Sequence, residues 1–126
     1  MSPVAPSGPV IQVFGREDSP ETRAALRFFK ERRAAAQFID LRRKSMAPGE
    51  LRRFVERLGA PALADATGRV WADAGLGYLR MDADELAARL LADQRLLRLP
   101  LVRVGNGFAA GRDEAAWKAL LANART

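Results

Sequence analysis

Hydrophobic residues recur along the chain in two patterns, one typical of buried strands and the other of amphipathic helices. Each of four short apolar runs predicts a strand, and these runs occupy residues 10–14, 36–41, 101–104 and 108–110. Apolar residues at helical spacing predict helices at residues 20–33, 50–58, 69–74, 82–91 and 114–121. The predicted order is therefore strand, helix, strand, a helical stretch, two strands and a last helix.

Local signals fix the start of two helices and the relation between neighbouring strands. Ser19 stands before Pro20, a pair that commonly begins a helix. Asp82 lies three residues before Glu85, as in a capping box. The first two strands are expected to be parallel because a helix separates them. The last two are expected to be antiparallel, because only Gly105-Asn106-Gly107 lies between them.

These elements predict an α/β fold with a four-stranded mixed sheet in a single domain, which suits a chain of 126 residues. We assign the domain to residues 10–126, with a helical insertion at about 46–95. Residues 1–9 are rich in proline and serine and are interpreted as a flexible N-terminal tail. No apolar run approaches the roughly 20 residues of a membrane span, and the start of the chain does not resemble a signal peptide. A cytoplasmic protein without membrane attachment is expected.

The absence of cysteine and histidine limits the possible chemistry more than any other feature of the composition. Without a thiol the chain has no redox couple and no cysteine nucleophile. Without imidazole the common zinc sites and Ser-His-Asp hydrolysis are excluded. Neither a cofactor nor a bound metal is expected.

The net charge of +6 comes from 21 Lys and Arg against 15 Asp and Glu. Such a charge allows attraction to nucleic acid or to an acidic protein surface. The arginines are spread through the helical segments, however, and the run Arg42-Arg43-Lys44 is typical of a solvated loop. Specific binding of nucleic acid is therefore not expected.

Four stretches, taken together with their order and spacing, resemble the arsenate reductase (ArsC)/Spx family, which has a thioredoxin-like fold. They are residues 13–26, Trp71 with Gly75-Leu76, residues 96–102 and Gly111-Arg112. The Leu-Leu-Arg-x-Pro sequence in the third stretch is closer to Spx than to the enzymes. The resemblance covers nearly the whole chain and implies the same order of strands and helices.

The resemblance implies that the position of the family's catalytic cysteine is occupied by Ser19. The second cysteine of the C-x-x-C versions corresponds to Thr22, so no thiol remains at either position. A serine hydroxyl needs a base, and no histidine is available. Asp18 or Glu17 could serve, but an acidic neighbour would repel an oxyanion such as arsenate. We therefore interpret Ser19 as a helix cap rather than a catalytic residue.

The oxyanion-binding arginines of the family are only partly retained. In our alignment two of them correspond to Asp65 and Leu99, and only Arg112 persists, either as an anion contact or as a surface side chain beside Asp113. The resemblance also implies that Pro100 is preceded by a cis peptide bond. The candidate binding residues around the former active site are Ser19, Arg23, Leu99, Pro100 and Arg112.

Three functions remain open from the sequence. The first is a redox-inactive binding or regulatory protein, for which the Spx resemblance implies the C-terminal domain of the RNA polymerase α subunit as partner, with candidate contacts at Arg43, Lys44, Arg52 and Arg53. The second is a glutathione- or glutaredoxin-type arsenate reductase seen as a cysteine-to-serine variant at position 19. The third is a small-molecule binder in the former active-site groove, which Leu99 would make more apolar.

Overall fold

The computed structural model describes residues 9–125, so the predicted N-terminal tail lies outside the described residues except for Pro9. Four strands form one sheet in the order β2-β1-β3-β4. The strands are β1 (Ile11–Gly15), β2 (Ala36–Asp40), β3 (Leu101–Val104) and β4 (Gly107–Ala110). β1 and β2 are parallel, whereas β1 with β3 and β3 with β4 are antiparallel. The predicted mixed sheet is confirmed.

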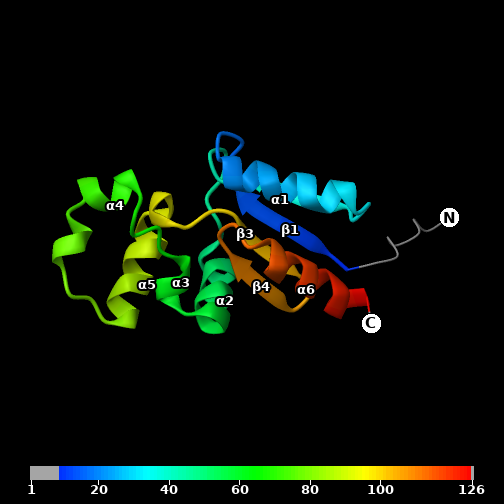
Figure 1. Ribbon diagram of the computed structural model, residues 1–126. Coiled ribbons are helices and arrows are strands. Elements are labelled where there is room, and N and C mark those ends of the chain that lie inside the picture. The colour runs from blue at the N-terminus through cyan, green and yellow to red at the C-terminus, as the bar shows by residue number, and fades with distance from the viewer. Residues whose placement is uncertain (1–8, 126) are drawn as a thin grey trace.

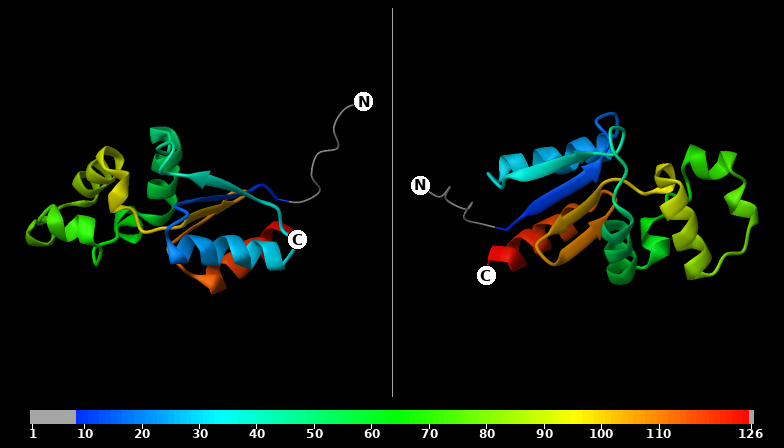
Figure 2. Two further views of the ribbon diagram at one scale, coloured as in Figure 1. Left: turned by 90° about the horizontal axis from the view of Figure 1, so that it is seen from above. Right: turned by 180° about the vertical axis from the view of Figure 1, so that it is seen from behind.

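Two helices, α1 (Pro20–Glu31) and α6 (Glu114–Arg125), cover one face of the sheet, as the view from above shows (Figure 2). Side chains alternate between the faces of a strand, so Val13 and its partner on β3, Val102, both point to this side. There they pack against Phe28 and Phe29 of α1 and Trp117 of α6. All five side chains are buried.

The opposite face of the sheet packs against α2 (Pro48–Leu58) and the helical segments that follow it. Phe14 of β1 and Phe108 of β4 both make edge-to-face contacts with Phe54 of α2. The segments after α2 extend beyond the end of the sheet (Figure 1). They are α3 (Ala60–Leu63), α4 (Arg69–Asp73), η1 (Leu76–Tyr78), α5 (Ala83–Ala92) and η2 (Gln94–Leu96).

Backbone hydrogen bonds join the two ends of this helical region to each other. The amide of Asp65 donates to the carbonyl of Leu96 at 2.9 Å, and the amide of Arg98 donates to the carbonyl of Leu63 at 2.7 Å. The chain after α3 is thereby held beside the chain that leads into β3. Among the described residues, no helix is long and apolar enough to cross a membrane.

The predicted boundaries need small corrections. The first helix ends at Glu31 rather than Arg33, because Arg33 has φ of 54°, outside the helical range. The second begins at Pro48, two residues earlier than predicted, and α3 was not predicted. β1 excludes Val10 and includes Gly15, β2 stops before Leu41, and β4 begins at Gly107.

Candidate functional site

The loop between β1 and α1 presents Ser19 at the start of the first helix. Ser19 has an extended backbone, with φ −86° and ψ 117°, and its Oγ accepts a hydrogen bond from the amide of Thr22 at 3.1 Å. The same hydroxyl donates to Glu21 Oε2 at 3.3 Å. Pro20 occupies the first helical turn, where a missing N–H costs nothing. Ser19 is thus the N-cap that the sequence predicts.

An ion pair between Arg16 and Asp18 lies within this loop. The Arg16 guanidinium donates through Nε and Nη2 to the two carboxylate oxygens of Asp18, at 3.0 and 2.9 Å. These hydrogen bonds lower the pKa of Asp18 and raise the pKa of Arg16. Asp18 is therefore bound to Arg16 and is a weak base, which removes it as a candidate activator of Ser19.

Ser19 lies at the rim of a cavity of about 500 Å³, which we call the Ser19 groove. The groove brings together residues from α1, the loop after α3, the segment before β3 and the loop after β4. Its lining residues are Ser19, Glu21, Asp65, Thr67, Arg95, Leu97, Arg98, Leu99 and Arg112. Three candidates from the sequence, Ser19, Leu99 and Arg112, therefore meet in one place.

The two remaining binding candidates, Arg23 and Pro100, do not line the groove, and neither does Thr22 at the second former thiol position. Thr22 is fully buried beneath the loop, where its Oγ1 accepts a hydrogen bond from the amide of Arg16 at 3.4 Å. Arg23 turns back to donate to the carbonyl of Glu17 at 2.8 Å. Pro100 is buried after a cis peptide bond, as predicted, and its carbonyl accepts from the amide of Gly111 at 2.8 Å.

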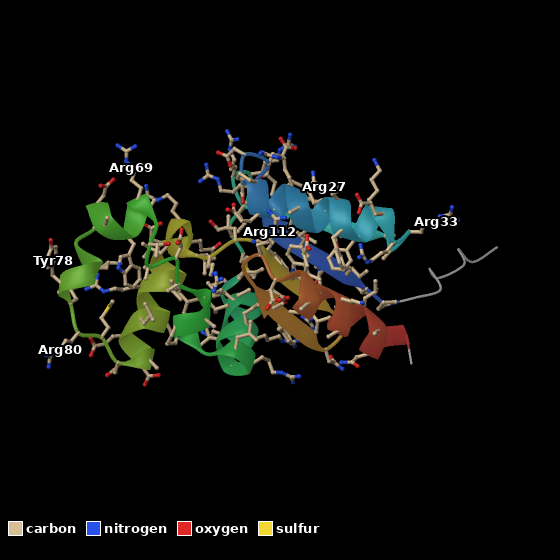
Figure 3. The ribbon with its side chains drawn as sticks, viewed as in Figure 1. Arg27, Arg33, Arg69, Tyr78, Arg80 and Arg112 are labelled. Atoms are coloured by element: carbon tan, nitrogen blue, oxygen red, sulfur yellow. The ribbon has the colours of Figure 1, made fainter. Side chains whose placement is uncertain are left out.

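Acidic and basic side chains alternate around the Ser19 groove. Asp65, which stands where the family resemblance places an arginine, accepts a hydrogen bond from Thr67 Oγ1 at 3.2 Å. Arg112 Nη2 lies 3.7 Å from Glu114 Oε1, and both side chains are more than half exposed. Figure 3 shows Arg112 where the sheet meets the helical region. The groove lining holds two acids, Glu21 and Asp65, against three arginines, Arg95, Arg98 and Arg112, so it is close to charge balance rather than strongly cationic.

The groove has lost the parts of a thiol-based active site. The chain has no cysteine, and the Ser19 hydroxyl is engaged as a helix cap. The hydrogen-bond acceptor of that hydroxyl is Glu21, an exposed carboxylate at the start of α1. Among residues 9–125, no group of three acidic side chains is placed to hold a metal ion. The groove therefore offers no thiol nucleophile.

Sequence reasoning missed four polar lining residues, namely Glu21, Thr67, Arg95 and Arg98. Glu21 lies two residues after Ser19, and Thr67 lies two residues after Asp65. Their closeness in the sequence to these two positions could have identified them. Arg95 and Arg98 flank the leucines that precede Pro100, a stretch that we used only for the resemblance.

Comparison with known proteins supports the same fold. A family model described as the ArsC family matches residues 15–120. The YffB protein superposes with a TM-score of 0.80 at 18% identity, over 89% of this chain and 99% of that chain. An arsenate reductase from Vibrio cholerae has a TM-score of 0.77 at 19% identity, over 90% of this chain and 99% of that one.

A third solved structure, an arsenate reductase (ArsC) related protein from Brucella melitensis, gives a TM-score of 0.67 at 16% identity over 91% of this chain and 97% of that chain. At these identities the likeness establishes the fold alone. The comparison with curated proteins gave no match.

Proposed function

The chain belongs to the ArsC family, and we propose that it is a redox-inactive member that acts by binding rather than by catalysis. The observation that supports this proposal most strongly is that Ser19 serves as the N-cap of α1. At the family's nucleophile position the side chain caps α1 through the amide of Thr22 at 3.1 Å. A thiolate at such a helix end would be stabilised by the backbone amides, whereas a hydroxyl stays protonated there.

We further propose the C-terminal domain of the RNA polymerase α subunit as the partner. The support is the Spx-like Leu-Leu-Arg-x-Pro stretch together with four exposed cations on two consecutive segments of the chain. Arg43 and Lys44 lie on the loop after β2, and Arg52 and Arg53 lie on the following helix, α2. Such rim charges mainly accelerate association and select a partner of opposite charge.

Titration of the full chain with the purified α-subunit domain tests the partner. The double variant Arg52→Glu/Arg53→Glu should weaken binding by about tenfold, mainly through a slower association rate. The matched control is Arg27→Glu/Lys30→Glu, which changes the net charge equally at two exposed positions of α1. Figure 3 shows Arg27 projecting from α1 on another side of the molecule. No binding by the wild type, or equal losses in both variants, would refute this partner.

Replacing Ser19 with cysteine tests whether the protein is redox-inactive. The wild type and Ser19→Cys should both lack arsenate reduction coupled to glutathione and glutaredoxin. A restored thiol lacks the arginine contacts now replaced by Asp65 and Leu99, and charge-assisted contacts of that kind are needed to hold the oxyanion. Turnover by Ser19→Cys above the buffer control would instead support an arsenate reductase altered at one position.

A further inference from the structure

A second cavity, with a volume of about 440 Å³, lies beside the Ser19 groove. The loop after β1, the loop after β2 and the η2 segment form its walls. Arg95 and Leu99 line both cavities. We call this second cavity the Arg42 cavity, because Arg42 lines it and does not line the Ser19 groove. Its volume lies within the range of sites that hold small molecules.

Hydrogen bonds hold the walls of the Arg42 cavity in place. The amide of Met46 donates to Gln94 Oε1 at 2.8 Å, and Gln94 Nε2 donates back to the carbonyl of Met46 at 2.9 Å. The amide of Leu41 donates to the carbonyl of Gly15 at 2.9 Å. The loop after β2 is therefore fastened both to η2 and to the end of β1. A preformed cavity of this kind avoids part of the entropic cost of ligand binding.

Three guanidinium groups line this cavity, and two of them have fixed orientations. Arg16 makes a two-point contact with Asp18, and Arg95 makes one with Asp93, with Nε and Nη2 at 2.9 and 2.8 Å from the two carboxylate oxygens. Among the described residues, no carboxylate lies within ion-pair distance of Arg42. Three guanidinium groups and one carboxylate, that of Asp93, line the cavity, so the lining itself carries a net positive charge although Asp18 and Asp40 lie near it. Arg42 is near enough to Asp18 to lower the pKa of that carboxyl, but it makes no ion pair within 4 Å and can contact an anion.

Besides the three arginines, the lining contains the Asp93 carboxylate, the Gln94 amide, one hydroxyl and three aliphatic side chains. Leu41, Ala92 and Leu99 supply aliphatic surface, and Ser45 supplies a group that can donate a hydrogen bond. This combination of a cationic rim, one hydroxyl and an aliphatic wall matches a ligand with an anionic head and a compact apolar body.

We propose that the Arg42 cavity binds a small organic anion, either a carboxylate or a phosphate monoester, that carries a compact apolar group. The anionic head contacts Arg42 and the outer edges of Arg16 and Arg95, and the apolar group rests against Leu41 and Leu99. The proposal does not depend on the polymerase partner, since none of the cations offered there lines this cavity.

The pH dependence of binding distinguishes the two kinds of anion. The charged groups around the cavity come from every wall and are Arg16, Asp18, Asp40, Arg42, Asp93 and Arg95. None is a histidine, the side chain that ordinarily titrates between pH 5 and 8. Any change in affinity between pH 5 and 7 therefore reports the ligand. A phosphate monoester should bind more tightly as it loses its second proton near pH 6, whereas a carboxylate should not.

Three probes with the same ring test the proposal by titration monitored in ¹H–¹⁵N NMR spectra of the full chain. Phenyl phosphate or benzoate should give saturable shifts at the Arg16 and Arg95 Nε–H groups and at the Gln94 side-chain amide. Benzyl alcohol, which is neutral, should not. The anion that binds more tightly, together with its pH profile, identifies the head group.

Two neighbouring arginines provide a matched pair of variants. Arg42→Gln should weaken anion binding by about tenfold, the effect of one charge-assisted hydrogen bond. Arg43→Gln removes the same charge from the next residue, which does not line the cavity but lies 3.9 Å from Asp40, and should change the affinity much less. Arg112→Gln, in the Ser19 groove, should have no effect. The dispersion of the NMR spectrum verifies that each variant is folded.

Several results would overturn the proposal. The proposal is wrong if neither anion gives a saturable shift at millimolar concentration. It is also wrong if benzyl alcohol binds as tightly as the anions, or if Arg42→Gln and Arg43→Gln lose the same anion affinity. A loss in Arg112→Gln without one in Arg42→Gln would place the anion in the Ser19 groove instead.

Discussion

Gln94 and Met46 are joined by a reciprocal pair of hydrogen bonds, although 48 residues separate them. The Gln94 side chain accepts from the amide of Met46 and donates to its carbonyl, so it pairs with the backbone as a neighbouring strand would. Met46 is 4% exposed, so water has little access to its backbone groups. One side chain thus satisfies both polar groups of a buried loop residue and anchors the loop between β2 and α2 to η2.

Replacing Gln94 with leucine should therefore destabilise the protein by about 2 kcal/mol, because two polar backbone groups of Met46 lose their partners. Urea unfolding would measure the loss, and faster hydrogen exchange at the Met46 amide would locate it. Gln37→Leu is the matched control, since Gln37 is exposed on the edge strand β2 and should change stability by less than about 0.5 kcal/mol. Equal effects would refute the structural role of Gln94.

The Ser19 cap makes a separate contribution to stability. Ser19→Ala removes the hydrogen bond to the amide of Thr22 and should cost about 1 kcal/mol. Ser19→Thr keeps a hydroxyl at the cap and should retain most of the stability. Ser45→Ala, on an exposed loop, should be neutral. If Ser19→Ala proved as stable as the wild type in urea unfolding, the hydroxyl would not be acting as a cap.

Trp117 is fully buried, and its indole Nε1–H has no hydrogen-bond partner among the described residues. Phenylalanine at this position would remove the unpaired donor while keeping an aromatic ring against Phe28. We expect Trp117→Phe to cost about 1 kcal/mol or less, whereas Trp117→Ala, which leaves a large cavity, should cost about 3–5 kcal/mol. Similar losses in the two variants would show that the indole N–H does contribute to stability.

Acid should weaken the fold through Asp18 and Asp93. The Arg16 and Arg95 hydrogen bonds lower the pKa of these two carboxyls in the folded state. A lowered pKa means that the ionised form stabilises the fold above the unfolded pKa, which is about 4. This contribution to stability is lost as the pH falls below about 4 and through the lower pKa that these carboxyls have in the folded state.

The variant Asp93→Asn should therefore show a shallower loss of stability with acid than the wild type does. Asp84→Asn, at an exposed position of α5, is the matched control and should follow the wild-type profile. Urea unfolding at a series of pH values gives the comparison, and salt should reduce the difference because these ion pairs are largely exposed. Parallel profiles for wild type and Asp93→Asn would contradict the prediction.

The sequence predicted those parts of the fold that depend on local signals. Ser19 and Asp82 cap their helices as expected, and Asp82 Oδ1 accepts from the amide of Glu85 at 2.8 Å. The short apolar runs identified all four strands, and the short Gly105-Asn106-Gly107 connection predicted the antiparallel direction of the last pair. The family resemblance, rather than any local pattern, supplied the cis peptide bond before Pro100.

Features that depend on long-range contacts were not predictable in this way. α3 is only four residues long, too short for a helical period to show. The ion pair between Arg103 and Glu50, at 3.0 Å, joins β3 to α2 across 53 residues. The Arg42 cavity was missed for the same reason, because its walls come from loops that no sequence pattern brings together.

The junction between β1 and α1 offers a final test, because Gly15 and Thr22 are in close contact there. A Cβ atom at Gly15 would overlap the hydroxyl and the methyl group of Thr22, which is fully buried. Gly15→Ala should therefore cost about 2 kcal/mol through overpacking. Thr22→Ala, which opens space and removes the acceptor of the Arg16 amide, should cost about 1 kcal/mol.

The double variant Gly15→Ala/Thr22→Ala should be more stable than the sum of the two single effects predicts, by about 1 kcal/mol, because the second change makes room for the new methyl group. Gly49→Ala is the control, since a Cβ there meets nothing within 4 Å, and its effect should add to that of Thr22→Ala. Urea unfolding of the five variants and the wild type completes both cycles, which share Thr22→Ala. Additivity in the Gly15 cycle would mean that the loop holding Ser19 moves freely enough to absorb the methyl group, and the Ser19 groove would then lack a rigid edge.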